Sequence, residues 1–180
     1  LSCIKTDFNF KEGILYPDTY FYKKNNFASD ILQKSHDRLK NYLDDLNFSS
    51  NNNDLDMKEL LILASIVEKE AGNNDEKKLI AGVFLRRLEE SMRLQADPTI
   101  IYGLLPNFDG DIKKSNILDR NNKYNTYMIK GLPPSPIAIS SLSSIDAVFN
   151  GKPGEFLYFV ADSKTLSLIH ISEPTRPVTI

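Results

Sequence analysis

The 180-residue sequence is poor in cysteine and histidine, which narrows the chemistry that it can carry. Its single cysteine, Cys3, cannot form a disulfide within the chain. His170 lies in a C-terminal segment that we expect to be non-native, and His36 is expected to be a half-exposed helix residue. A Ser–His or Cys–His nucleophile is therefore nearly excluded. No HExxH motif, comparable His/Cys cluster, GxGxxG or P-loop is present, so we expect no metal and no cofactor.

Long hydrophobic runs and an excess of basic charge are also absent. No stretch stays apolar over the roughly eighteen residues that a membrane span requires. The formal net charge of −2 gives no electrostatic support for a nucleic-acid partner, and no basic stripe with interleaved aromatics is visible. A hydrophobic content of 41% and a charged content of 26% are ordinary for a globular protein. The length suffices for one domain with a real core.

The most informative stretch is residues 60–72, LLILASIVEKEAG. Asp56 followed by Glu59 is a capping-box pattern that predicts a helix start, and Gly72 is a natural stop. At about 100° per residue, the apolar side chains of this helix lie nearly all the way round it. The pattern therefore predicts a helix of about four turns that is buried on most sides.

The last turn of this predicted helix carries two glutamates, Glu68 and Glu70. Burial disfavours the charged form of a carboxyl group and raises its pKa, which suits a general acid at neutral pH. The alternative is a Glu-Lys-Glu sequence on a solvated helix face, which is common. Helix geometry does not choose between the two glutamates, because each lies about 80° to one side of the main apolar stripe.

The surrounding patterns predict an α+β fold with two layers. A further helix is expected over residues 76–91, with Arg87 solvated, and it would form a helical hairpin with the helix before it. Aromatic-rich segments at 16–22 and 156–160 are predicted strands. We therefore expect a central helical hairpin packed on a small mixed β-sheet that contains both strands.

Two polar segments could face a ligand. Asp97 followed by Pro98 predicts a helix start, with Asp97 at the N-cap, and this would hold Gln95 and Asp97 at a rigid turn. A purely structural cap is an equally good interpretation of Asp97. Residues 124–141, YNTYMIKGLPPSPIAISS, combine hydrogen-bonding side chains with a stiff proline-rich loop, and such loops often carry function.

The C-terminal residues 166–176, LSLIHISEPTR, match one reading frame of a common transposase-based sequencing-library adapter. We therefore expect the natural sequence to end near Thr165 and residues 166–180 to be an adapter-derived, non-native tail. The alternative is that residues 168–171 form a genuine short strand.

Five motifs in order carry a resemblance to a known family: EGILYPDTYFY, LASIVEKEAG, RLQADPTIIYGL, YNTYMIKGLPPSPIAISS and FLYFVAD. Together they resemble the endolytic murein transglycosylases, the MltG or YceG-like family, from about residue 12 to residue 163. The resemblance implies that residues 12–165 are part of the family's catalytic domain. It also implies a membrane anchor and a LysM-like region before residue 1.

The resemblance implies a bacterial inner-membrane enzyme with its catalytic domain on the periplasmic, extracytoplasmic face. It would cut nascent peptidoglycan glycan strands between MurNAc and GlcNAc, leave 1,6-anhydroMurNAc ends, and so terminate strand elongation. Peptidoglycan synthases are the implied protein partners. Two rival functions stay open: a non-catalytic peptidoglycan-binding or divisome scaffold module, and a lysozyme-like hydrolase.

In the family the catalytic residue is the second glutamate of the EKE motif, which is Glu70 here, and Glu68 becomes a flanking carboxylate. Two departures from the family pattern stand out. Ser135 occupies a position of the GLPPSP loop where the family usually has glycine. The family's HxF segment after FVAD is replaced here by the adapter-like tail.

The remaining site residues follow from the resemblance and from their polar character. We expect Gln95, Asn125 and Tyr127 to orient the N-acetyl sugar by hydrogen bonds, and Tyr124 to pack against it. Asp97 is expected to contact the substrate and is the candidate for a second carboxylate.

Overall fold

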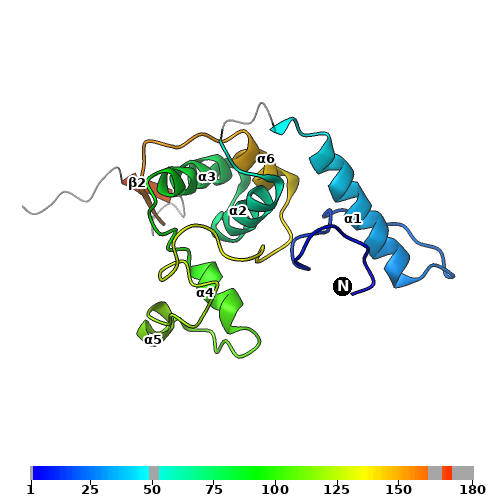
Figure 1. Ribbon diagram of the computed structural model, residues 1–180, viewed down its shortest axis with the longest axis horizontal. Helices are drawn as coiled ribbons and strands as arrows, with labels where there is room; N and C mark the ends of the chain where they lie inside the picture. The colour runs from blue at the N-terminus through cyan, green and yellow to red at the C-terminus, as the bar shows by residue number, and fades with distance from the viewer. Residues whose placement is uncertain (1, 49–52, 162–167, 172–180) are drawn as a thin grey trace, which may run out of the picture.

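The computed structural model describes residues 2–48, 53–161 and 168–171, and the regular secondary structure of these residues is mostly helical (Figure 1). The helices are α1 (Ala28–Asp44), α2 (Met57–Glu70), α3 (Asn74–Glu89), α4 (Asp97–Leu104), α5 (Lys114–Ile117) and α6 (Leu142–Phe149). The strands are β1 (Tyr158–Ala161) and β2 (Leu168–Ile171).

Helix α2 begins with the predicted capping box. Asp56 Oδ1 accepts a hydrogen bond from the Glu59 backbone N–H at 2.8 Å, and Glu59 Oε2 accepts one from the Asp56 N–H at 3.0 Å. Every residue from Leu60 to Val67 is buried, as the all-round apolar pattern predicts. The helix ends at Glu70 because Ala71 turns to an extended conformation. The catalytic candidate therefore occupies the last position of a helix that is fixed by the core.

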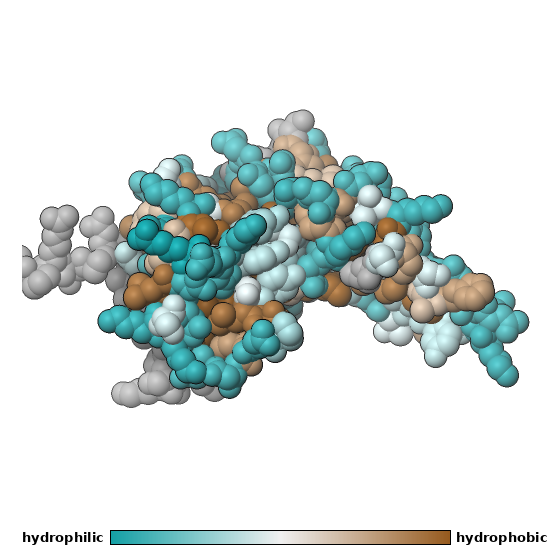
Figure 2. All heavy atoms as spheres, turned by 60° about the horizontal axis from the view of Figure 1, so that its bottom comes forward, coloured by the Kyte–Doolittle hydropathy of each residue, from teal (hydrophilic) through white to brown (hydrophobic). Residues whose placement is uncertain are grey.

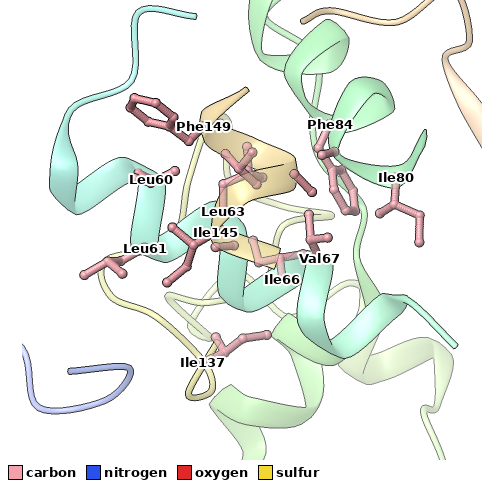
Figure 3. Packing of buried hydrophobic residues seen from close by; sticks show 14 of the residues in the cluster. Leu60, Leu61, Leu63, Ile66, Val67, Ile80, Phe84, Ile137, Ile145 and Phe149 are labelled. Carbon is pink, nitrogen blue, oxygen red and sulfur yellow. The ribbon is translucent and has the colours of Figure 1, made fainter. Parts of the chain in front are cut away.

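The core lies where α6 packs across α2 and α3, as Figure 3 shows. Leu63 and Val67 of α2 meet Ile145 of α6 and Phe84 of α3, and all four are buried. Ile137 reaches the same cluster from the loop before α6. Burying each such side chain contributes about 1.5–3 kcal/mol, so this helical packing holds the last turn of α2 in place.

The predicted small mixed β-sheet is wrong. β1 pairs only with β2 among the described residues, as an antiparallel ladder that sets Tyr158 opposite Ile171. Residues 16–22 form no strand: the Tyr16 backbone N–H donates to the Ser35 carbonyl of α1 at 3.3 Å, and Pro17 has no N–H to offer a ladder. Tyr16 packs against Tyr42 of α1, whereas Phe21 and Tyr22 are exposed, so the architecture is helix on helix.

β2 lies inside the segment predicted to be adapter-derived. That origin stays a prediction, because a backbone pairing carries no information about where a sequence comes from. Thr165, the predicted natural end, lies outside the described residues.

His36 is buried rather than half-exposed, with only 2% of its surface accessible. Its Nδ1 lies 2.9 Å from the Ile14 carbonyl oxygen, so Nδ1 carries the proton and donates. This contact joins α1 to the N-terminal segment and gives His36 a structural role away from Glu70.

Among the described helices, none is both long and apolar enough to cross a bilayer. On the face shown in Figure 2, hydrophilic side chains surround separate hydrophobic patches.

Candidate active site

Glu70 opens into a small pocket of about 190 Å³. Its walls come from α2, α3, the turn before α4, the first residue of α4, the loop after α5, and β1. The lining residues are Glu70, Arg87, Gln95, Asp97, Tyr127 and Phe159. Segments that are far apart in the sequence therefore meet around one glutamate.

Burial at the end of α2 is the main reason why the pKa of Glu70 rises from 4.5 to about 7. The negative charge of Asp97 raises this pKa further. The positive charge of Arg87 and a hydrogen bond from the Asp97 backbone act in the opposite direction without cancelling the rise. Glu70 can therefore hold a proton near neutral pH and give it up, as a general acid must.

Glu68 lies in a different environment, against the start of α6. Its Oε2 accepts hydrogen bonds from the Ser141 hydroxyl at 2.6 Å, from the Ser141 backbone N–H at 3.1 Å, and from Ser144 Oγ. Lys77 Nζ lies 3.2 Å from the same oxygen. Burial alone would raise the pKa of Glu68, but these donors outweigh it and lower the pKa to about 2. Glu68 is thus an ionised carboxylate that joins α2 to α6.

Gln95 and Asp97 lie on the tight turn before α4, as predicted, although Asp97 is not the N-cap. Ala96 takes the cap position and Asp97 is the first helical residue. Gln95 adopts a φ of 52°, a left-handed conformation that is uncommon for residues other than glycine. Its backbone N–H donates to the Thr126 carbonyl at 3.2 Å, which helps to hold the turn. The Asp97 side chain is therefore free to accept a hydrogen bond from the Tyr127 hydroxyl at 2.7 Å.

Asn125 is fully buried and does not line this pocket. Its Oδ1 accepts a hydrogen bond from the Tyr127 backbone N–H at 3.0 Å. Its Nδ2 donates to the carbonyls of Asn116, Ile117 and Asp119. The amide is thus used inside the protein, where it shapes the loop that presents Tyr127.

Tyr124 also lies outside the lining of the Glu70 pocket. Its ring packs against that of Tyr102, with centroids 4.7 Å apart. Its hydroxyl lies 2.7 Å from Ser135 Oγ. Ser135 therefore joins the proline-rich loop to the loop after α5 by a hydrogen bond.

Arg87 is the site residue that the sequence interpretation missed. We expected it to be solvated, but it is buried. Its Nε donates to the Leu157 carbonyl at 2.7 Å, and a terminal guanidinium nitrogen donates to the Leu94 carbonyl at 2.6 Å. The sequence does contain a signal for this burial: Arg87 follows Ile80 by seven residues, which places it on the inner stripe of α3. Phe159 was likewise predicted only as a strand residue.

A larger cavity of about 600 Å³ lies elsewhere, with Leu85 and Leu88 in its lining. Two of its carboxylates have structural partners: Glu59 belongs to the capping box of α2, and Glu89 accepts a hydrogen bond from Arg86. Within the described residues, no group of three or more His, Cys, Asp or Glu side chains could hold a metal ion. The pocket at Glu70 is the better candidate for proton transfer.

Comparison with known proteins assigns the chain to a family. The model of the YceG-like family matches residues 2–170, so the chain belongs to the YceG-like family. A crystal structure of a YceG-like protein from Listeria monocytogenes matches with a TM-score of 0.75 and 34% identity, over 89% of this chain and 52% of that chain.

Two curated relatives carry a functional name. The endolytic murein transglycosylase of Bacillus subtilis is 34% identical over 153 residues, which is 84% of this chain and 42% of that protein. The endolytic murein transglycosylase of Streptococcus pneumoniae D39 is 33% identical over 156 residues, which is 84% of this chain and 28% of that protein. The chain therefore spans less than half the length of these two relatives.

Proposed function

We propose that this chain carries the catalytic centre of an endolytic peptidoglycan lytic transglycosylase, with Glu70 as its catalytic acid. The observation that carries the proposal is the half-buried Glu70, with its pKa raised to about 7, in a polar pocket of a YceG-like chain. The names of the relatives supply the substrate class, which is murein. The environment of Glu68, whose pKa is about 2, argues against Glu68 as the proton donor.

The reaction needs one group that first gives and then takes a proton. Protonated Glu70 donates to the glycosidic oxygen that follows MurNAc C1, and the C1–O bond breaks with its electron pair moving to that oxygen. Positive charge develops at C1 and the ring oxygen. The 6-hydroxyl oxygen of the same MurNAc then bonds to C1, and its proton passes to the Glu70 carboxylate. The product is a 1,6-anhydroMurNAc end, and no water is consumed.

The pocket suggests how the sugar is held. We assign direct sugar contacts to Gln95, Asp97 and Tyr127, which line the pocket with Glu70. Asn125 and Tyr124, which were expected to contact the sugar, lie outside the pocket lining, so we assign them no direct contact. Asn125 instead shapes the loop that presents Tyr127. The positive φ of Gln95 supports its role, because strained residues are often retained at functional sites.

We place the action of the enzyme on the extracytoplasmic face of the plasma membrane, where murein strands are extended. The protein to which this chain belongs, called the parent protein below, would be anchored in that membrane and would act beside a peptidoglycan synthase. Cleavage within a nascent strand would then limit its length.

The test is muropeptide mass spectrometry on glycan strands digested by the parent protein and by its Glu70→Gln variant. We expect 1,6-anhydroMurNAc ends from the parent and their loss in Glu70→Gln. Glu89→Gln, at an exposed glutamate near the end of α3, is the matched control and should keep them.

Three other results would each point elsewhere. Equal anhydro ends in the parent and in Glu70→Gln would move the acid away from Glu70. Reducing MurNAc ends would indicate a hydrolase. No cleavage by either protein would favour a glycan-binding or scaffold module.

A further inference from the structure

Two charged side chains share the pocket with Glu70, and they come from different elements. Arg87 belongs to α3 and Asp97 to α4. We propose that the two divide the electrostatic work of catalysis. Arg87 stabilises the carboxylate that Glu70 becomes when it gives up its proton, and Asp97 stabilises the positive charge that develops on the sugar. This inference rests on the proposed function.

Arg87 is suited to its part because its charge is buried among neutral partners. Only 5% of its surface is exposed, and its hydrogen bonds go to the Leu94 and Leu157 carbonyls. Its guanidinium also lies over the Tyr158 ring, 4.9 Å from the centroid. Among the described residues no carboxylate lies within salt-bridge distance of it.

A buried cation without an ionic partner is costly, and that cost falls when a negative charge forms nearby. The carboxylate that forms on Glu70 during the reaction is such a charge. Arg87 therefore favours the state that follows proton donation.

Asp97 is suited to the opposite part. It lines the pocket and is exposed, so a charge at this position is only weakly desolvated. The Tyr127 hydroxyl donates to Asp97 Oδ1 at 2.7 Å and fixes the direction of the carboxylate. Tyr127 thus positions Asp97 in addition to its proposed contact with the sugar. A fixed negative charge beside an oxocarbenium-like sugar stabilises it without reorganisation during the step.

The charges balance before and during the reaction. While Glu70 is protonated, Arg87 and Asp97 cancel and the pocket is neutral. Proton transfer creates one negative charge on Glu70 and one positive charge on the sugar, and each then has an opposite charge nearby. The groups that act on Glu70 support this division, since Asp97 raises its pKa and Arg87 lowers it. Tyr127 is the remaining titratable group in the lining.

The test is the pH dependence of kcat for strand cleavage in variants of the parent protein. Activity falls as Glu70 loses its proton, so the basic limb of the profile reports its pKa. Asp97→Asn removes a negative charge and should move the limb about 0.5–1 pH unit lower. Arg87→Gln should move it by a similar amount to higher pH. A merely structural role would not produce opposite shifts.

The conservative variants separate charge from folding. Asp97→Glu and Arg87→Lys keep the charges and should keep the limb near its wild-type position. Arg86→Gln removes a half-buried arginine that pairs with Glu89 and Glu90, and it should leave the profile unchanged. On the acid side of the limb, Asp97→Asn should lower kcat about 10–100-fold with little change in KM, because the lost contact belongs to the transition state.

The inference would be overturned if the basic limbs of the Asp97→Asn and Arg87→Gln profiles stayed in place or moved in the same direction. An unchanged kcat in Asp97→Asn would also overturn it. If Arg87→Gln does not fold, the decisive measurement is an NMR titration of the ¹³C-labelled Glu70 carboxyl in Asp97→Asn. An unshifted titration there also overturns the inference. The proposed function fails separately, when Glu70→Gln still yields anhydro ends.

Discussion

Glu68→Gln and Glu70→Gln remove a negative charge from the same turn of α2, yet they should change the free energy of unfolding in opposite directions. For Glu70 the folded-state pKa is about 7 against an ordinary value of 4.5, a difference worth about 3 kcal/mol. Partial solvent access reduces this to about 1–2 kcal/mol. Folding favours the protonated form of Glu70, so its contribution to stability is greatest below pH 4.5 and is lost as the pH rises through 7. Glu70→Gln should therefore be more stable than the wild type by about 1–2 kcal/mol at pH 8, and nearly equal to it at pH 4.5.

Glu68→Gln should lower the free energy of unfolding, the reverse of the effect expected for Glu70→Gln. The folded-state pKa of Glu68 is about 2, so its stabilising contribution is fully present above pH 4.5 and is lost as the pH falls towards 2. The side chain is 27% exposed, which discounts the nominal value of about 3 kcal/mol. Glu68→Gln also leaves the ammonium group of Lys77, whose side chain is only 8% exposed, without its carboxylate. We expect a loss of about 2–3 kcal/mol at pH 7 and a melting temperature lower by about 4–10 °C.

The assay is urea unfolding followed by far-UV circular dichroism between pH 4.5 and pH 8.5. Glu89→Gln is the surface control and should change the free energy of unfolding by less than about 0.5 kcal/mol. A Glu70→Gln protein that is less stable than the wild type at pH 8 would refute a site that disfavours the charged glutamate. A Glu68→Gln protein of wild-type stability would refute the role of Glu68 as a link between α2 and α6.

Three further predictions each concern one residue: Glu70, Gly103 or Ser65. Strand cleavage by the wild type should lose half its rate near pH 7 on the basic side, because the pKa of Glu70 is about 7, and a pH–rate profile measures this. Gly103→Ala should destabilise the fold by about 2 kcal/mol in urea titrations, since the new Cβ would lie 1.9 Å from Asn122 Oδ1; an unchanged midpoint would contradict the packing of α4. Ser65→Ala should cost about 1–2 kcal/mol because it removes the acceptor of the buried Ile137 N–H, and thermal unfolding beside Ser65→Thr shows whether the hydroxyl is the cause.

The parts of the fold that local sequence controls could be predicted. Helix α2 was predicted correctly because its capping box spans four residues and its apolar pattern covers every side. The helical hairpin followed from the turn at Asn73, whose side-chain oxygen accepts hydrogen bonds from the backbone N–H groups of Asp75 and Glu76. Such interactions need no knowledge of the rest of the chain.

The predicted sheet failed because strand formation depends on a partner. Residues 16–22 have the aromatic character of a strand, but Tyr16 bonds to α1 instead, and Phe21 and Tyr22 are exposed. Arg87 was misjudged for a related reason. Arginine is usually exposed, and only the carbonyls of Leu94 and Leu157, brought in by the tertiary fold, make its burial favourable.

The sequence by itself determined that two glutamates would stand at the end of a buried helix. It could not decide which of them holds a proton, because both face similar local surroundings. The tertiary structure decided this by bringing Lys77 and Ser141 to Glu68, and Arg87 and Asp97 to Glu70. The physical reason is that a pKa depends on desolvation and on charges a few ångströms away, and those neighbours come from segments distant in the sequence.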